Sequence, residues 1–212
     1  MTAVLGTTGG AAGPGSPLRL QRDDGAVCRV LGGLARGQLP PLPGALVALA
    51  VTAVLLATGV GEQHGGALFA PAVVLLLTGP AAEHAHDGRF DWLVPPIVRS
   101  IEYGYLAVLG FAQGVPAPFT YVLLAVLAFH HHDVVYRARQ GLRPPAWVSR
   151  AGLGGEGRML VAAFAGLLGL LPFAYASLAV YLGVVFGGES VRTWARTPCG
   201  SGVTVDLEEE EA

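Results

Sequence analysis

Long apolar stretches, separated by short polar segments, make up most of this chain of 212 residues. Four of the stretches are residues 44–61, 66–82, 94–113 and 117–135. Each comes close to the roughly 20 helical residues that cross a hydrocarbon core of about 30 Å. A fifth stretch, 158–187, is too long for one ordinary span and too short for two full ones. The pattern predicts an all-α, polytopic membrane bundle.

The fifth stretch decides how many spans there are. Pro172 divides it, and a proline inside a helix removes a backbone hydrogen bond and kinks or breaks the helix. We therefore expect a tight hairpin of two short helices, which brings the total to about six transmembrane helices. One long kinked helix is the alternative.

The basic residues support a count of six. With six spans, the segments on one side are 1–43, 83–100, 136–158 and 188–212, and all 13 basic residues fall in them. Cytoplasmic segments of membrane proteins carry an excess of Arg and Lys, whereas five spans would place the last two arginines outside. The sequence thus predicts a multi-pass protein of the inner (plasma) membrane with both termini in the cytoplasm.

The flanks differ from the central region. Residues 1–24 are rich in Gly, Ala, Pro, Ser and Thr, and 195–212 end in an acidic run. Neither has the apolar content to pack, so we expect two disordered tails. The segment 25–194 is then one transmembrane helical domain. It starts with residues 25–40, whose apolar side chains at helical spacing predict an amphipathic helix on the membrane surface.

Composition agrees with a protein that faces lipid. Hydrophobic residues make up 52% of the chain and charged residues 13%, against about 25% charged in soluble domains. The two cysteines have no metal-binding spacing, so neither a disulfide framework nor a zinc site is indicated. Membrane lipid is the expected partner, nucleic acid is not, and a homodimer is left open.

Candidate metal ligands lie between the second and third stretches. Glu83, Asp87 and Asp91 are spaced four apart, so on a helix they would share one face. Carboxylate oxygens there could hold Mg²⁺ or Mn²⁺. The alternative is a solvated polar loop, which Gly88 favours.

A second candidate is Glu102, which lies inside an apolar stretch. Placing a charged carboxylate inside a membrane-spanning segment costs free energy, so such a group normally has a partner of opposite charge or a functional role. Arg99, three residues earlier, can reach it on the same helix face. A structural Glu102–Arg99 ion pair and a catalytic or ligand-binding carboxylate are both open.

The end of the fourth stretch carries further polar residues. Three consecutive histidines at 130–132 point about 100° apart on a helix and cannot converge on one ion. Asp133 is the acid of this group and joins Glu102 as a candidate catalytic residue. Arg137 and Arg139 follow it and, with Arg99, are candidates for binding a phosphate group.

A resemblance to a known family rests on three runs of the sequence. They read HDGRFDWLVPPIVRSIEYGYLAVLGFAQGVPAP, FHHHDVVYRARQG and GLGGEGRMLVAAFAGLLGLLPFAYASLAVYLGVVFGGES. Over residues 25–194 the chain resembles an actinobacterial membrane domain of unknown function. That domain is often found at the end of longer chains that also carry nucleotidyltransferase and CDP-alcohol phosphatidyltransferase domains. The resemblance implies a partner of one of these two kinds.

The chain is more distantly similar to the CDP-alcohol phosphatidyltransferases, six-helix membrane enzymes that use divalent metal at a cytoplasmic-side active site. Three short segments resemble, in degenerate form, the second half of that family's sequence: residues 88–91, 102–103 and 136–139. The family signature, DxxDGxxAR followed by GxxxDxxxD, is incomplete here, because no Asp occurs between 25 and 86. The similarity implies a degenerate version of that fold.

Three functions are considered, of which the first two follow from these resemblances and the third belongs to another class. The first is an accessory or degenerate domain linked to phospholipid head-group (CDP-alcohol) metabolism. The second is a divergent, active, metal-dependent CDP-alcohol phosphotransferase. The third is a small membrane transporter or scaffold protein, which the lack of ionisable residues near the midplane of the bundle disfavours.

Overall fold

The computed structural model describes residues 21–59, 65–85, 88–140, 142 and 145–196. Within these residues the chain is entirely helical and has no strand. The expected all-α class is therefore confirmed.

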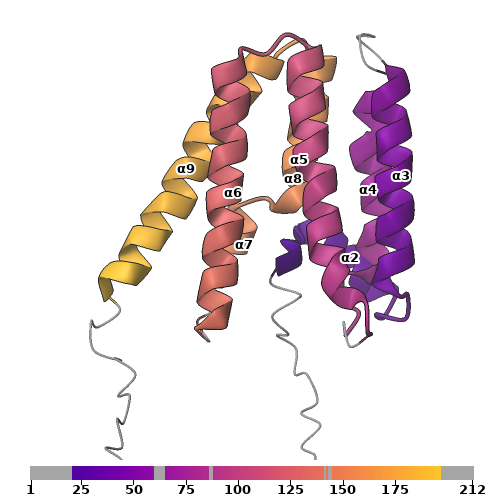
Figure 1. Cartoon of the computed structure of the whole chain (residues 1–212), viewed down its shortest axis with the longest axis vertical. Helices are drawn as coiled ribbons and strands as arrows, with labels where there is room; N and C mark the ends of the chain where they lie inside the picture. The colour runs from indigo at the N-terminus through magenta and orange to yellow at the C-terminus, as the bar shows by residue number, and fades with distance from the viewer. Residues whose placement is uncertain (1–20, 60–64, 86–87, 141, 143–144, 197–212) are drawn as a thin grey trace, which may run out of the picture.

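Six helical segments form the body of the molecule, and they fall where the apolar stretches predicted them (Figure 1). They are α3 (Pro41–Gly59), α4 (Ala70–Thr78) between the 3₁₀ turns η1 (Gly66–Phe69) and η2 (Gly79–Ala81), α5 (Val94–Ala112), α6 (Ala117–Arg139), α8 (Gly154–Leu167) and α9 (Leu171–Arg196). Shorter elements are α2 (Ala26–Leu34), η3 (Asp91–Leu93) and α7 (Ala146–Ala151).

Proline marks the starts of several of these helices. Pro71, Pro95 and Pro118 lie in the first turns of α4, α5 and α6, where a missing N–H costs nothing because it has no partner within the helix. Pro172 has the same place in α9. The stretch 158–187 is therefore a hairpin and not one kinked helix. Its second arm, with 26 residues, is longer than expected.

The helices pack as a bundle around α5, which contacts α3, α6 and α8. Helix α4 lies between α3 and α8, and α9 packs against α6 and α8. Figure 1 shows α5 and α6 reaching down to about the same level, with α2 and α7 beside the lower halves of the long helices. The candidate site lies further up, because Glu102 is the ninth of the 19 residues of α5.

Two helices of the described residues are long and apolar enough to cross a membrane, Pro41–Gly59 and Leu171–Ala195. Only 28% and 39% of their most apolar windows are buried inside the protein, so most of that apolar surface faces outward. By contrast α8 has 14 residues, or about 21 Å of helix, which is short of a 30 Å core. Membrane character thus has weak support, and the count of six spans stays a prediction.

Helix α2 fits the expected amphipathic helix in residues 25–40. It buries Cys28 and Gly32, whereas Val30 and Leu34 are exposed at 63% and 75%. An exposed apolar face on a short helix suits the interface of a membrane. The helix ends at Leu34, six residues before the end of the expected range.

Candidate functional site

The buried guanidinium of Arg158 is the centre of the site. Its side chain is fully buried at the start of α8, and its Nε donates to Glu102 Oε1 at 2.6 Å. Nη2 lies 3.2 Å from Glu102 Oε2, and Nη1 donates to the carbonyl of Gly152 at 2.9 Å. The carboxylate of Glu102 is therefore held through both oxygens by one arginine, in the two-pronged geometry that makes such pairs strong.

Asp23, which precedes α2, completes the environment of Arg158. Nη2 of Arg158 donates to Asp23 Oδ2 at 2.6 Å, and His131 Nε2 lies 3.5 Å from the same oxygen. The other ring nitrogen of His131 is 2.6 Å from the hydroxyl of Tyr103. Burial raises the pKa of Asp23, but Arg158 and the hydrogen bond from His131 outweigh it, so the pKa lies below its ordinary range.

The start of α2 is fixed by an acid from α8. Glu156 accepts hydrogen bonds from the backbone N–H groups of Gly25, at 2.9 Å, and Cys28, at 3.3 Å. A carboxylate from elsewhere in the chain thus satisfies N–H groups that have no partner within the helix. The N–H of Gly155 in turn donates to the carbonyl of Asp23 at 3.1 Å.

Glycine allows this close approach of two backbones. Gly154 has φ +67°, and a Cβ on it would overlap the backbone of Gly25. A Cβ on Gly25 would in turn overlap the carbonyl of Leu153. The segment 21–25 is therefore docked against the first turn of α8, not merely close to it.

Arg22 ties the same segment to α4. Its guanidinium lies 2.8 Å from Asp24 Oδ2 and donates to the carbonyls of Thr78, at 2.9 Å, and Ala81, at 3.3 Å. These carbonyls end α4 and η2, where a cation is favoured. Burial, together with the nearby charge of Glu156, raises the pKa of Asp24 to about 6 despite the contact with Arg22.

We call the group of Arg22, Asp23, Asp24, Glu102, Glu156 and Arg158 the ion cluster. A cavity of about 10 Å³ lies among its side chains, which is room for one water molecule at most. The cluster joins the N-terminal segment to α4, α5 and α8 and has no space for a larger ligand.

Two sequence predictions are corrected here. The ion pair between Glu102 and Arg99, one of two alternatives that the sequence left open, is wrong, because Glu102 binds Arg158 and Arg99 donates to the carbonyl of Gln21 at 2.8 Å. The tail expected to be disordered over 1–24 is wrong at its end, since Arg22 is 2% exposed. Residues 1–20 of that tail and 197–212 of the other lie outside the described residues.

Asp133 and Arg137 lie in a separate group between α6 and α9. Nη2 of Arg137 is 2.7 Å from Asp133 Oδ2, and Nη1 is 2.7 Å from Glu189 Oε1. Asp133 also accepts from the indole N–H of Trp194 at 3.2 Å. Two candidates are thus bound to each other and hold α9 to α6, while Arg139, at the end of α6, is exposed.

The proposed metal ligands do not share a helix face. Residues 82–85 and 88–90 are turns and irregular chain, and Asp91 starts a 3₁₀ turn. Asp91 accepts from the N–H of Gly88 at 3.0 Å and lies 3.9 Å from His84. Glu83 lies against α2, and Asp87 is outside the described residues. In the described part of the chain no three His, Cys, Asp or Glu side chains are grouped to hold a metal ion.

Sequence reasoning missed Arg158 and Asp23 as partners. Arg158 had a signal, because it is the charged residue at the start of the fifth apolar stretch, two residues after Glu156. The three charges at 22–24 had a weaker one, as the last residues of a stretch that is otherwise almost uncharged. Their contact with α8 joins residues 135 positions apart.

Over the described residues, the fold and the site thus define an all-helical bundle with a buried ion cluster. The chain belongs to a family of unknown function, DUF5941, which it matches over residues 16–210. No curated protein and no solved structure matches it. The expected membership of a domain family of unknown function is confirmed at this level.

Proposed function

We propose that the protein is an accessory membrane domain linked to phospholipid head-group metabolism, with six spans and both termini in the cytoplasm. One observation carries the choice of an accessory role over a catalytic one. Both oxygens of Glu102, the leading candidate for catalysis, are bound by a fully buried arginine. A metal ion or substrate would have to displace that arginine, which has no solvent to move into.

The contacts of the ion cluster support a structural task. Arg158 binds α5 through Glu102 and the N-terminal segment through Asp23, while Glu156 fixes the start of α2. Buried ionic groups have been found to specify one arrangement among several in some proteins. In this proposal the cluster sets the position of the segment before α2 on the bundle.

The membrane part of the proposal is supported by the outward-facing apolar surface. Large apolar side chains on α9 are exposed, among them Phe173 at 72%, Val180 at 68% and Val184 at 70%. Contiguous apolar exposure of this kind is rare on soluble monomers. The link to phospholipid chemistry is supported by the resemblance to a domain that is found with CDP-alcohol phosphatidyltransferases.

The test is a reconstitution of the full chain in phospholipid vesicles, alone and together with a CDP-alcohol phosphatidyltransferase from the same genome. Transfer of a labelled alcohol from a CDP-linked lipid is measured with Mg²⁺ or Mn²⁺ present. We expect no turnover by the chain alone and at least a twofold change in the transferase's rate when both are present.

Two results would count against the proposal. Metal-dependent turnover by the chain alone, lost in both Glu102→Gln and Asp133→Asn, would instead identify a divergent phosphotransferase. No effect on the transferase would remove the link to head-group metabolism. Arg192→Gln, an exposed change on α9, is the matched control for both variants.

A further inference from the structure

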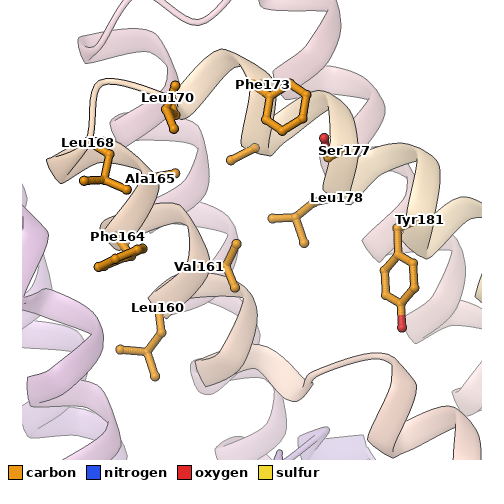
Figure 2. Close-up of a pocket in the computed structure, with 11 residues that line it drawn as sticks. Leu160, Val161, Phe164, Ala165, Leu168, Leu170, Phe173, Ser177, Leu178 and Tyr181 are labelled. Atoms are coloured by element: carbon orange, nitrogen blue, oxygen red, sulfur yellow. The ribbon is translucent and has the colours of Figure 1, made fainter.

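A groove of about 600 Å³ runs between α8 and α9, away from the ion cluster. Figure 2 shows residues of its two walls, with Leu160, Val161 and Phe164 on α8 and Phe173, Leu178 and Tyr181 on α9. Its volume is within the 300–1,000 Å³ of typical ligand sites. Because its walls are almost wholly apolar, water is a poor occupant.

The groove has two different ends. One is the turn 168–170 between the helices, where Leu168 and Leu170 line it. At the other end the hydroxyl of Tyr181 donates to the carbonyl of Ala151 at 3.0 Å, which places the last residue of α7 beside the groove. From Phe173 to Tyr181 the wall is eight residues of helix, or about 12 Å.

Helix α7 gives the second end a membrane-interface character. Trp147 is 44% exposed, and Arg150, next to Ala151, is exposed as well. Arg150 donates through Nε to the carbonyl of Ala146 at 3.4 Å, and no carboxylate of the described residues forms an ion pair with it. Trp and Arg are residues that anchor a protein at the head-group level of a bilayer.

The geometry points to a phospholipid site: one acyl chain lies in the α8–α9 groove and the phosphate of an anionic head group binds Arg150. The apolar wall matches the chain, and the cationic end matches the phosphate. The inference rests on the membrane placement in the proposed function and not on the accessory role.

A transmembrane helix of another protein or of a second copy fits this groove less well. Helices associate in membranes through small residues that let backbones approach. Eight of the eleven residues that line the groove have large apolar or aromatic side chains, and Ala165, Ala174 and Ser177 are the small ones. A flexible acyl chain can follow such a wall, whereas a rigid helix cannot.

Native mass spectrometry of the full chain, stripped of lipid in detergent, tests the site. Phosphatidylglycerol or phosphatidylcholine is added, and the fraction of protein with one bound lipid is measured. Ser177→Phe fills the groove from an exposed position on α9, and Val180→Phe adds similar bulk on the same helix outside the groove. We expect Ser177→Phe to weaken binding of both lipids at least tenfold and Val180→Phe to leave it unchanged.

Arg150→Gln separates the head group from the chain. It should reduce the preference for phosphatidylglycerol over phosphatidylcholine at least threefold without changing phosphatidylcholine binding. The control Arg192→Gln, at an exposed position, should leave that preference unchanged. If Ser177→Phe and Val180→Phe bind lipid equally well, the bound lipid lies on the general surface and not in the groove, and the proposed site is overturned. A dimer that Ser177→Phe alone dissociates would assign the groove to a second copy and would also overturn it. Neither result depends on any effect on a transferase, so failure here is distinct from failure of the accessory role.

Discussion

Replacement of Arg158 by Met tests whether the ion cluster holds the bundle together. The change keeps a long apolar side chain but removes the only arginine that contacts both Glu102 and Asp23 among the described residues. Glu102 is 2% exposed, so its carboxylate would stay buried without a counter-charge. Removing one partner of a buried ion pair costs about 3–5 kcal/mol, and we expect Arg158→Met to destabilise the fold by that amount.

Glu102→Gln should cost less, because Arg158 keeps its contacts with Asp23 and with the carbonyl of Gly152. The loss is one charge-assisted interaction, worth about 1.5–3 kcal/mol. The double variant combines Arg158→Met with Glu102→Gln, so it has no carboxylate at position 102 and no unpaired charge there. Its cost should therefore be below the sum of the two single changes by roughly 1–3 kcal/mol.

Unfolding of the purified chain in detergent, followed by tryptophan fluorescence, measures these differences. At about 2–4 °C per kcal/mol for a chain of this size, Arg158→Met should lower the midpoint by roughly 6–20 °C. Arg192→Met, on the exposed side of α9, is the control and should change stability by less than about 0.5 kcal/mol. A midpoint for Arg158→Met equal to that of Arg192→Met, or strict additivity with Glu102→Gln, would refute the reasoning.

Three further predictions concern other parts of the structure. The pKa of Asp24 is raised to about 6, so the folded state binds a proton more tightly than the unfolded state, and the free energy of unfolding falls as pH rises from about 4 to 6. Asp24→Asn should flatten the plot of unfolding free energy against pH over that range, and an unchanged plot would contradict this. Gly154→Ala should lower the unfolding midpoint well beyond Gly169→Ala, since both glycines have positive φ but only the first faces a backbone, and equal losses would argue against the docked segment. In a chain without its native cysteines, single cysteines introduced at 114–117 should react with impermeant thiol reagents added outside intact cells, and single cysteines at 140–146 should not. Labelling of 140–146 from outside would exclude six spans with cytoplasmic termini.

The helices could be predicted from the sequence because their signals are local. Apolar runs of the right length and prolines in first turns set the positions of α3, α5 and α6 to within a few residues. Pro172 correctly predicted the hairpin, since the constraint acts on the residues next to it. The 14-residue length of α8 could not be predicted, because the residues at 154–157 that belong to it are glycines and one acid.

The partners in the candidate site could not be predicted in the same way. Arg99 looked like the partner of Glu102 because it is near in sequence and on the same helix face. The actual partner, Arg158, is 56 residues away, and only the packing of α5 against α8 brings it there. Asp23 was hidden for a similar reason, as it lies in a stretch whose composition is typical of disorder and is held only by contacts with the rest of the bundle.

The separation between partners in the ion cluster also sets an order of assembly. Glu102 is synthesised 56 residues before Arg158 and Asp23 is synthesised 135 residues before it. At a translation rate of about 5–20 residues per second, Arg158 is synthesised roughly 3–11 s after Glu102 and roughly 7–27 s after Asp23. In the proposed membrane placement, α5 thus enters the bilayer with an unneutralised acid at the ninth of its 19 residues. The segment before α2 is the first described part of the chain to leave the ribosome, and it docks only after α8 has been made.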